Sequence, residues 1–284
     1  MSVNTRMDRR EMLRWTAGAA LAAAPLSALS AQEQDQRRRR YGPFRMGLQS
    51  YSLRGYKLDE ALQHTNALGV RAWEAYGGHI PLTTNAGEIM ALREKLRAAR
   101  VRMMAHGVAA FGADKAKNRE VFEAAKAMGI PTISADPAPE SFDNLEELVQ
   151  EFNIKIAIHN HGPGHRYDKL EDVTKAVNGR HKLIGACVDT GHFLRSSENP
   201  VKVIETLGER VYGCHLKDVK DTTKFTILGE GDLDLVGTLR ALRDVKFSDV
   251  LALEYEENPM DPIADIRKCL EAVRAAVEKL PPAA

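Results

Sequence analysis

The amino-acid sequence predicts a single (β/α)8 barrel, a TIM barrel of the α/β class, and three observations support this. After Tyr41, short apolar segments alternate eight times with longer segments, several of which are amphipathic. The apolar segments begin roughly 25 to 40 residues apart, which fits one strand and one helix per repeat. Eight such repeats match the size of this barrel, which typically takes about 250 residues.

The eight apolar segments are the predicted strands. They span residues 46–51, 70–75, 101–107, 130–135, 154–159, 183–189, 210–216 and 250–256. Between them, residues 86–100 and 118–129 repeat apolar residues at intervals of three and four, as amphipathic helices do. Gly69 and Gly129 directly precede predicted strands, where glycine readily ends a helix. The alternative, an open doubly wound sheet, lacks a glycine-rich GxGxxG turn after its first strand.

Composition and charge exclude several classes of protein. Hydrophobic residues make up 44% and charged residues 28% of the 284 residues, which is typical of a folded domain. The net charge is only +1, and the residues after Arg40 carry a net charge of −3. A general nucleic-acid binder needs a surplus of positive charge, so we expect no nucleic-acid partner. The three cysteines are scattered, and we expect them to be buried and unpaired.

The N-terminal segment has the features of an export signal. Arg9 and Arg10 precede an alanine-rich apolar stretch that ends in small residues, the arrangement of a signal peptide. Adjacent arginines are typical of twin-arginine signals. An amphipathic helix is the alternative, but Pro25 interrupts the run. The apolar stretch is shorter than the about 20 residues that span a bilayer, so we expect no permanent membrane anchor.

These features predict the organisation and destination of the chain. We expect a cleaved twin-arginine signal peptide over residues 1–31, a solvated linker over residues 32–43 and the barrel over residues 44–284. The export machinery would be a partner of the N-terminus, and the mature protein would be periplasmic. The oligomeric state cannot be read from this pattern.

Ionisable side chains recur at the carboxyl ends of the predicted strands, where the active sites of (β/α)8 barrels form. They are Glu74, His106, His159, His161, Asp189, His192, His215, Lys217, Glu254 and Glu256. A lone histidine in such a place is more often a core or capping residue. Recurrence on several strands favours a functional site instead.

Four of these residues form a candidate metal site. Side chains alternate along a strand, so His159, Asp189, His215 and Glu254 can face a common point. Two imidazoles and two carboxylates suit one divalent cation such as Mn²⁺, Zn²⁺, Co²⁺ or Fe²⁺ better than Mg²⁺. A hydrogen-bonded network without metal is the alternative. Glu254 and Glu256 share a face of the strand, and either can supply the fourth ligand.

Such a site suits proton abstraction next to a carbonyl. A cation that binds two adjacent oxygens of a keto-sugar acidifies the neighbouring C–H bond. His159 or Glu254 would move the proton, and Lys217 would stabilise the enediolate oxygen. A surface lysine paired with Asp218 is the alternative for Lys217. We expect six residues to contact the substrate, namely Glu74, His106, His161, His192, Lys217 and Glu256.

Several segments together resemble a known superfamily. GVRAWEAYG, AIHNHG, VDTGH, CHLKD, LGEGDLDL and LALEYE occur in this order over most of residues 45–275. They resemble the xylose isomerase-like barrels, usually named sugar phosphate isomerases/epimerases. The resemblance implies a metal-dependent barrel that acts on sugars, keto-sugars or inositol derivatives. It also places the metal ligands at His159, Asp189, His215 and Glu254.

One departure from the superfamily bears on the reaction. Ketose 3-epimerases of this superfamily carry a proton-transferring Glu where this chain has His159. A histidine there also suits branches that isomerise, dehydrate or β-eliminate oxidised sugars. Because the predicted export separates the protein from cytoplasmic sugar phosphates, we expect an unphosphorylated carbohydrate substrate.

The prediction is therefore a metal-dependent isomerase or epimerase that works through a metal-stabilised enediolate. A metal-dependent lyase or dehydratase acting on an oxidised sugar or glycoside is the first alternative. A non-catalytic sugar-binding barrel is more distant. Some relatives cut abasic DNA, but the negative charge of the barrel disfavours an endonuclease.

Overall fold

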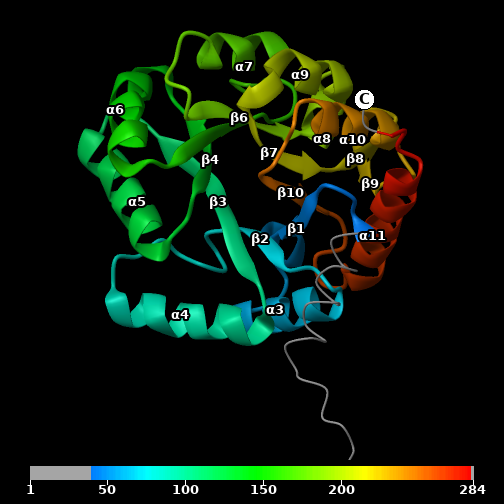
Figure 1. Cartoon of the computed structure of the whole chain (residues 1–284), viewed down its shortest axis with the longest axis horizontal. Coiled ribbons are helices and arrows are strands. Elements are labelled where there is room, and N and C mark those ends of the chain that lie inside the picture. The colour runs from blue at the N-terminus through cyan, green and yellow to red at the C-terminus, as the bar shows by residue number, and fades with distance from the viewer. Residues whose placement is uncertain (1–39, 283–284) are drawn as a thin grey trace, which may run out of the picture. The chain divides into compact units, whose positions relative to one another are not determined.

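Eight parallel strands form a closed barrel surrounded by helices (Figure 1). The computed structural model describes residues 40–282. The predicted signal peptide, residues 1–31, and residues 32–39 of the predicted linker lie outside the described residues, so both stay predictions. In the barrel, each strand pairs with the next one along the chain, and β1 closes the barrel against β10.

The structure confirms the predicted (β/α)8 barrel and all eight of its predicted strands. The barrel strands are β1 (Arg45–Gln49), β2 (Ala72–Ala75), β3 (Arg102–Phe111), β4 (Thr132–Pro137), β5 (Lys155–His159), β6 (Ile184–Asp189), β7 (Val211–Leu216) and β10 (Val250–Leu253). The last predicted strand, residues 250–256, is too long. The Glu254 N–H still donates to the Leu216 carbonyl of β7 over 3.0 Å, but the next N–H, that of Tyr255, donates to Ser52 Oγ over 2.9 Å and the backbone leaves the sheet. Glu254 and Glu256 therefore lie in the loop that follows β10.

Helices cover the outside of the barrel. They are α3 (Leu58–Ala67), α4 (Ala86–Ala99), α5 (Lys115–Met128), α6 (Phe142–Phe152), α7 (Leu170–Val177), α8 (Thr190–Arg195), α9 (Pro200–Leu207), α10 (Leu235–Asp244) and α11 (Ile263–Glu278). Their ends follow the expected chemistry. Asp234 caps α10 by accepting from the Gly237 N–H over 2.8 Å, and Gly129 ends α5 with φ of 78°. No helix in residues 40–282 is long and apolar enough to cross a membrane.

Two apolar clusters fill the described part of the chain. The larger one includes Trp73, Ile158 and Leu251 and packs the strands against the helices. The smaller one comprises Ala72, Met104, Ala105, Val250 and Ala252. Because alternate residues of a strand share a face, Ala72 lies on the same side as Glu74, and Ala252 on the same side as Glu254. The smaller cluster is thus an apolar layer inside the barrel, with the ionisable residues in the layer above it.

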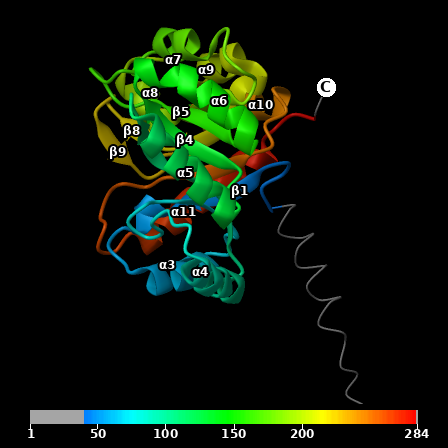
Figure 2. The same cartoon turned by 90° about the vertical axis from the view of Figure 1, so that its left-hand side faces the viewer.

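A short hairpin that the sequence analysis did not predict follows β7. Its strands, β8 (Asp218–Lys220) and β9 (Lys224–Thr226), pair antiparallel as a separate two-stranded sheet. Figure 2 shows the hairpin beside α8, at the end of the barrel where the parallel strands terminate. The hairpin therefore borders the region in which the candidate site residues lie.

Candidate metal centre

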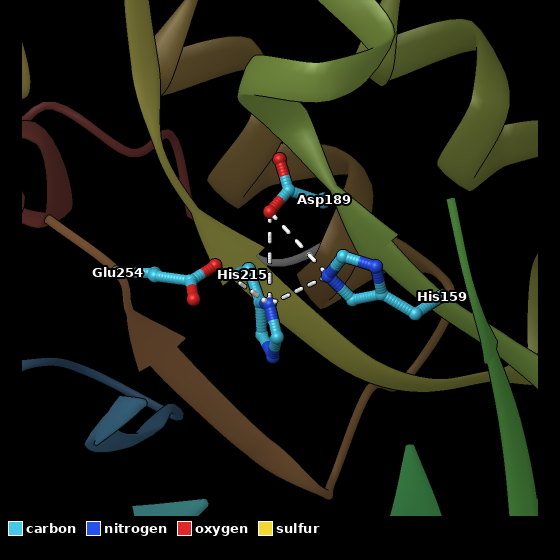
Figure 3. Close-up of side chains that lie close together, drawn as sticks. All are labelled: His159, Asp189, His215 and Glu254. Carbon is cyan, nitrogen blue, oxygen red and sulfur yellow. Dashed lines mark hydrogen bonds and ion pairs between the residues drawn. The ribbon is translucent and has the colours of Figure 1, made fainter. Parts of the chain in front are cut away.

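Four side chains converge at one point (Figure 3). They come from three neighbouring barrel strands and from the loop that follows a fourth. His159 ends β5, Asp189 ends β6, His215 lies on β7 and Glu254 follows β10. His215 Nδ1 lies 3.0 Å from His159 Nε2 and 3.1 Å from Glu254 Oε2. Both of these ring nitrogens lie 3.6 Å from Asp189 Oδ2. We call these four residues the ligand cluster.

The atoms that face one another in the ligand cluster suit a divalent cation. Asp189 Oδ2 and Glu254 Oε2 are buried, and the Lys217 ammonium lies 3.0 Å from the first and 2.8 Å from the second. His215 Nε2 lies 2.9 Å from a carboxylate oxygen of Glu74, which can only accept. Nε2 of His215 therefore carries a proton. Burial alone would lower the pKa of His215, but its neighbours, Glu74 and Glu254 among them, raise it, so a cation would have to replace a proton on Nδ1, the nitrogen that faces the other three ligands. Two nitrogen and two oxygen donors match zinc, manganese, cobalt or iron.

The cluster also separates the two glutamates that the sequence left open. Glu254, and not Glu256, lies among the other three ligands. Glu256 instead forms an ion pair with Lys217 at the more exposed edge of the site. A second group of metal-binding residue types, Glu74, Cys187 and His215, shares His215 with the cluster. Burial raises the pKa of the Cys187 thiol, which disfavours the thiolate that a metal prefers.

All three cysteines are buried and unpaired, as predicted.

Hydrogen bonds to α8 and to Asn160, the residue that follows β5, hold Asp189 in place. Its Oδ1 accepts from the His192 N–H over 2.8 Å, which makes it the N-cap of α8. The fully buried Asn160 accepts from the Asp189 N–H over 2.7 Å and donates to the Asp189 carbonyl over 3.0 Å. Asn160 is not among the site residues predicted from the sequence, although it stands between two of them, His159 and His161. These bonds leave Asp189 Oδ2 directed toward the ligand cluster.

Lys217 is a buried cation at the edge of the ligand cluster. Its Nζ lies 3.0 Å from Asp189 Oδ2 and 2.8 Å from Glu254 Oε2, and it pairs with Glu256 as well. Burial alone would lower the pKa of Lys217, but these carboxylates raise it above its ordinary value. Burial alone would likewise raise the pKa values of Asp189 and Glu254, yet Lys217 holds both below their usual range. The side chain of Lys217 is therefore an ammonium surrounded by carboxylates.

The alternative of a surface lysine paired with Asp218 is wrong. Asp218 is buried and faces the other way, toward the LGEGDLDL segment. Its carboxylate accepts backbone N–H groups from Gly229 over 2.8 Å, Gly231 over 3.1 Å and Leu233 over 3.0 Å. This segment is thus a loop that is hydrogen-bonded to the hairpin.

Two further histidines adjoin the ligand cluster. The ring of His161 lies 4.6 Å from that of His159 and 5.6 Å from that of His192, between centroids. Burial and then the neighbouring imidazoles lower the pKa of His161 to about 3. Burial, opposed by Asp189 and assisted by Lys217, lowers the pKa of His192 to about 4. Both rings are neutral at neutral pH, and their contact with substrate stays a prediction.

Glu74 and His106, two other predicted substrate contacts, are bonded inside the barrel. Glu74 is fully buried and uses one oxygen for His215 and the other for Gln49 Nε2 at 3.0 Å. It lies behind His215, which argues for a positioning role and against contact with substrate. His106 Nε2 lies 2.9 Å from the Ile80 carbonyl, while its Nδ1 has no partner among the described residues. A role of His106 toward substrate stays a prediction.

Comparison with known proteins agrees with this architecture. The xylose isomerase-like TIM barrel family matches residues 62–276, which is most of the chain. The chain belongs to the xylose isomerase-like TIM barrel family. This confirms the family resemblance drawn from the sequence motifs.

Individual relatives of the family are distant. An inosose dehydratase of Clostridium tetani is 28% identical over 143 residues, 42% of this chain and 46% of the relative. The chain thus matches about half the length of such curated relatives. The zinc-bound IolI protein has a TM-score of 0.69 at 18% identity, covering 84% of this chain and 100% of IolI. A Bacillus anthracis protein described as a "probable 3-DHS dehydratase" involved in petrobactin synthesis has a TM-score of 0.65 at 15% identity, covering 82% of this chain and 98% of that protein. These two structures share the fold of this chain.

Proposed function

We propose that the protein is a metal-dependent lyase that eliminates water or an alcohol from a keto-sugar or keto-inositol. The observation that carries this proposal is the ligand cluster with the ammonium of Lys217 beside it. The dehydratase activity named for the C. tetani relative supports elimination over isomerisation. Zinc bound by a protein of the same fold supports a divalent metal.

The chain supplies distinct groups for each part of an elimination. A divalent cation, when bound, supplies a Lewis acid that polarises the substrate carbonyl and acidifies the adjacent C–H bond. His159, Asp189, His215 and Glu254 would hold it. Lys217 places a fixed positive charge next to them, where negative charge develops on the carbonyl oxygen as the proton leaves.

Glu256 is the carboxylate best placed to move the proton. His159 and Glu254, the predicted proton carriers, direct their lone pairs into the ligand cluster, where a cation would use them. Glu256 lies outside the cluster and is 24% exposed at its side chain. It would take the proton from the carbon next to the carbonyl. The carbon–oxygen bond one carbon further on then breaks as the double bond forms, and Glu256 returns the proton to the departing oxygen.

The isomerase or epimerase predicted from the sequence shares the first step of this scheme. In that reaction the proton returns to carbon and no bond to oxygen breaks. Epimerisation by two carboxylates is disfavoured here, because His159 stands where the related epimerases carry one of them. The two reactions therefore differ in the fate of the proton, and this difference can be measured.

The test combines metal analysis with product analysis in D₂O. Full-length protein purified without chelator should hold about one equivalent of Mn, Zn, Co or Fe per chain. With keto-sugars and keto-inositols, NMR should then show an unsaturated ketone and a released hydroxyl compound. Deuterium in recovered or isomerised substrate without elimination would identify an isomerase instead.

Asp189→Ala should lose both the metal and the turnover, whereas alanine at the exposed Asp244 should change neither. A fully active, metal-containing Asp189→Ala protein would refute the proposal.

A further inference from the structure

We propose that the substrate carries a carboxylate, and that Arg195 binds it beside the ligand cluster. This inference rests on the proposed function, because it specifies the substrate class of the same site as a keto-sugar acid. It is carried by the position of Arg195, by its lack of an anionic partner and by the arrangement of the groups around it.

Arg195 lies where the end of the barrel opens. It is the last residue of α8, the helix that begins directly after Asp189. One guanidinium nitrogen lies 3.4 Å from His192 Nδ1, and the guanidinium carbon lies 5.1 Å from the centroid of the Phe225 ring. Phe225 belongs to β9 of the hairpin. The guanidinium is therefore half-buried between α8 and the hairpin, at the same end of the barrel as the ligand cluster.

The charge of Arg195 is not balanced by the protein. Within residues 40–282, no carboxylate lies within 4.0 Å of its guanidinium, although nearby cations are paired. Lys217 contacts three carboxylates, and Arg166 lies 3.3 Å from Asp136. A half-buried guanidinium has lost part of its hydration, and a carboxylate or phosphate is the usual replacement. Arg195 is thus a free positive charge at the site.

His192 points to the same conclusion. Its Nδ1 faces Arg195 at 3.4 Å, and its Nε2 faces Lys217 Nζ at 3.5 Å. Whatever its protonation state, an imidazole offers at most one ring-nitrogen lone pair, so it can accept from at most one of these two cations. The other ring nitrogen must turn its N–H toward a positive charge. An oxyanion between Arg195 and His192 would accept from both and remove this conflict.

The surroundings favour a carboxylate over a phosphate. The planar guanidinium fork matches the two oxygens of a carboxylate, and a single free cation matches a single negative charge. Phosphate sites usually add backbone N–H groups from a helix N-terminus. Arg195 lies instead at the end of its helix, where the backbone presents carbonyl groups. Only the ring of His192 separates Arg195 from Lys217, so the carboxylate would lie a few bonds from the keto group.

The experiment is calorimetric titration of the full-length protein with three matched sugars. D-glucuronate and D-glucose differ only in the oxidation of one carbon, and D-glucose 6-phosphate replaces the carboxylate with a phosphate. We expect glucuronate to bind at least about tenfold more tightly than glucose, as one charge-assisted hydrogen-bond pair would give. Arg195→Gln should abolish this preference. Arg166→Gln is the matched control, because its charge is already neutralised by Asp136, and it should keep the preference.

Equal binding of glucuronate and glucose, or a preference that survives in Arg195→Gln, would overturn the inference. Tighter binding of glucose 6-phosphate than of glucuronate would also overturn it, in favour of a phosphate ligand. The titration is run on metal-loaded and on metal-free protein. Absence of metal uptake would refute only the proposed function. The glucuronate preference depends on Arg195, and we expect Arg195→Gln to leave the metal content unchanged.

Discussion

His215 connects the ligand cluster with the interior of the barrel. One ring nitrogen faces Glu74 at 2.9 Å, and the other lies 3.0 to 3.6 Å from the remaining three ligands. A metal-ligating histidine depends on the partner of its other nitrogen, which fixes the tautomer and the orientation of the ring. Burial alone would raise the pKa of Glu74, but the adjacent His215 lowers it below its ordinary value. Glu74 thus stays an anion that accepts the proton of Nε2.

Glu74→Gln should weaken metal binding without unfolding the protein. Glutamine keeps the shape of the side chain but removes the charge that fixes the His215 tautomer. We expect metal affinity to fall about 10- to 100-fold, as measured by competition with a chromogenic chelator. Glu120→Gln, an exposed change on α5, serves as the control. An unchanged affinity in Glu74→Gln would show that Glu74 does not position His215.

Lys217→Met should separate metal binding from turnover. The ammonium shares Asp189 Oδ2 and Glu254 Oε2 with any bound cation, so its removal relieves a like-charge repulsion. We expect metal retention to be equal or stronger, while kcat falls about 10²- to 10³-fold through the loss of oxyanion stabilisation. Lys220→Met, on the exposed end of β8, should leave both unchanged. Loss of metal in Lys217→Met would instead give Lys217 a structural role.

The sequence predicted the members of the ligand cluster but not the details of the site around it. Strand alternation and the family motifs identify His159, Asp189 and His215, because a strand end determines where each side chain points. Alternation treats Glu254 and Glu256 alike. The structure separates them, because the Glu254 N–H still donates to the Leu216 carbonyl, whereas the Tyr255 N–H donates to Ser52 Oγ. The periodicity of a sequence does not predict contacts between residues that are distant along the chain.

At the scale of single elements, the hairpin and the loop behind it form one unit. Asp218, the first residue of β8, binds three backbone N–H groups of the LGEGDLDL segment. The hairpin turn places Asp221 and Thr222 at φ of 53° and 56°. Such turns usually carry asparagine and glycine, and this one has neither. Short strands rich in lysine and an unusual turn explain why the sequence did not predict the hairpin.

Asp218→Ala should destabilise this unit and leave the ligand cluster intact. Because Asp218 Oδ1 also accepts from the Val219 N–H, the substitution leaves four buried or partly buried N–H groups without their acceptor, at about 1 kcal/mol or more each. We expect the free energy of unfolding in urea to fall by about 2–4 kcal/mol, with Asp218→Asn intermediate because it keeps one acceptor oxygen. Metal content should not change. A loss below about 1 kcal/mol would mean that the loop finds other acceptors.

At the scale of the whole molecule, the barrel is divided into an apolar and an ionisable layer. Ala72, Met104, Val250 and Ala252 fill the inner layer, and the space there is narrow. A Cβ atom at Gly47 would lie 2.6 Å from Val250 Cγ2. The eight-strand pattern is predictable from sequence because every repeat carries the same local signal. The local signal does not show which strand ends lie close together, because this depends on how the barrel closes.

Metal removal should therefore lower the stability of the whole barrel. The ligands come from β5, β6, β7 and the loop after β10, so one cation would link four segments that are consecutive around the barrel. A ligand that binds only the folded state stabilises it by about 2.7 kcal/mol at a hundredfold excess over Kd. For a domain of this size we expect chelation to lower Tm by roughly 5–10 °C, and added metal to restore it. Asp189→Ala should show the low Tm with or without metal. If metal analysis finds the site filled and chelation leaves Tm unchanged, the bound ion does not link these strands, and the ligand cluster is not where it binds.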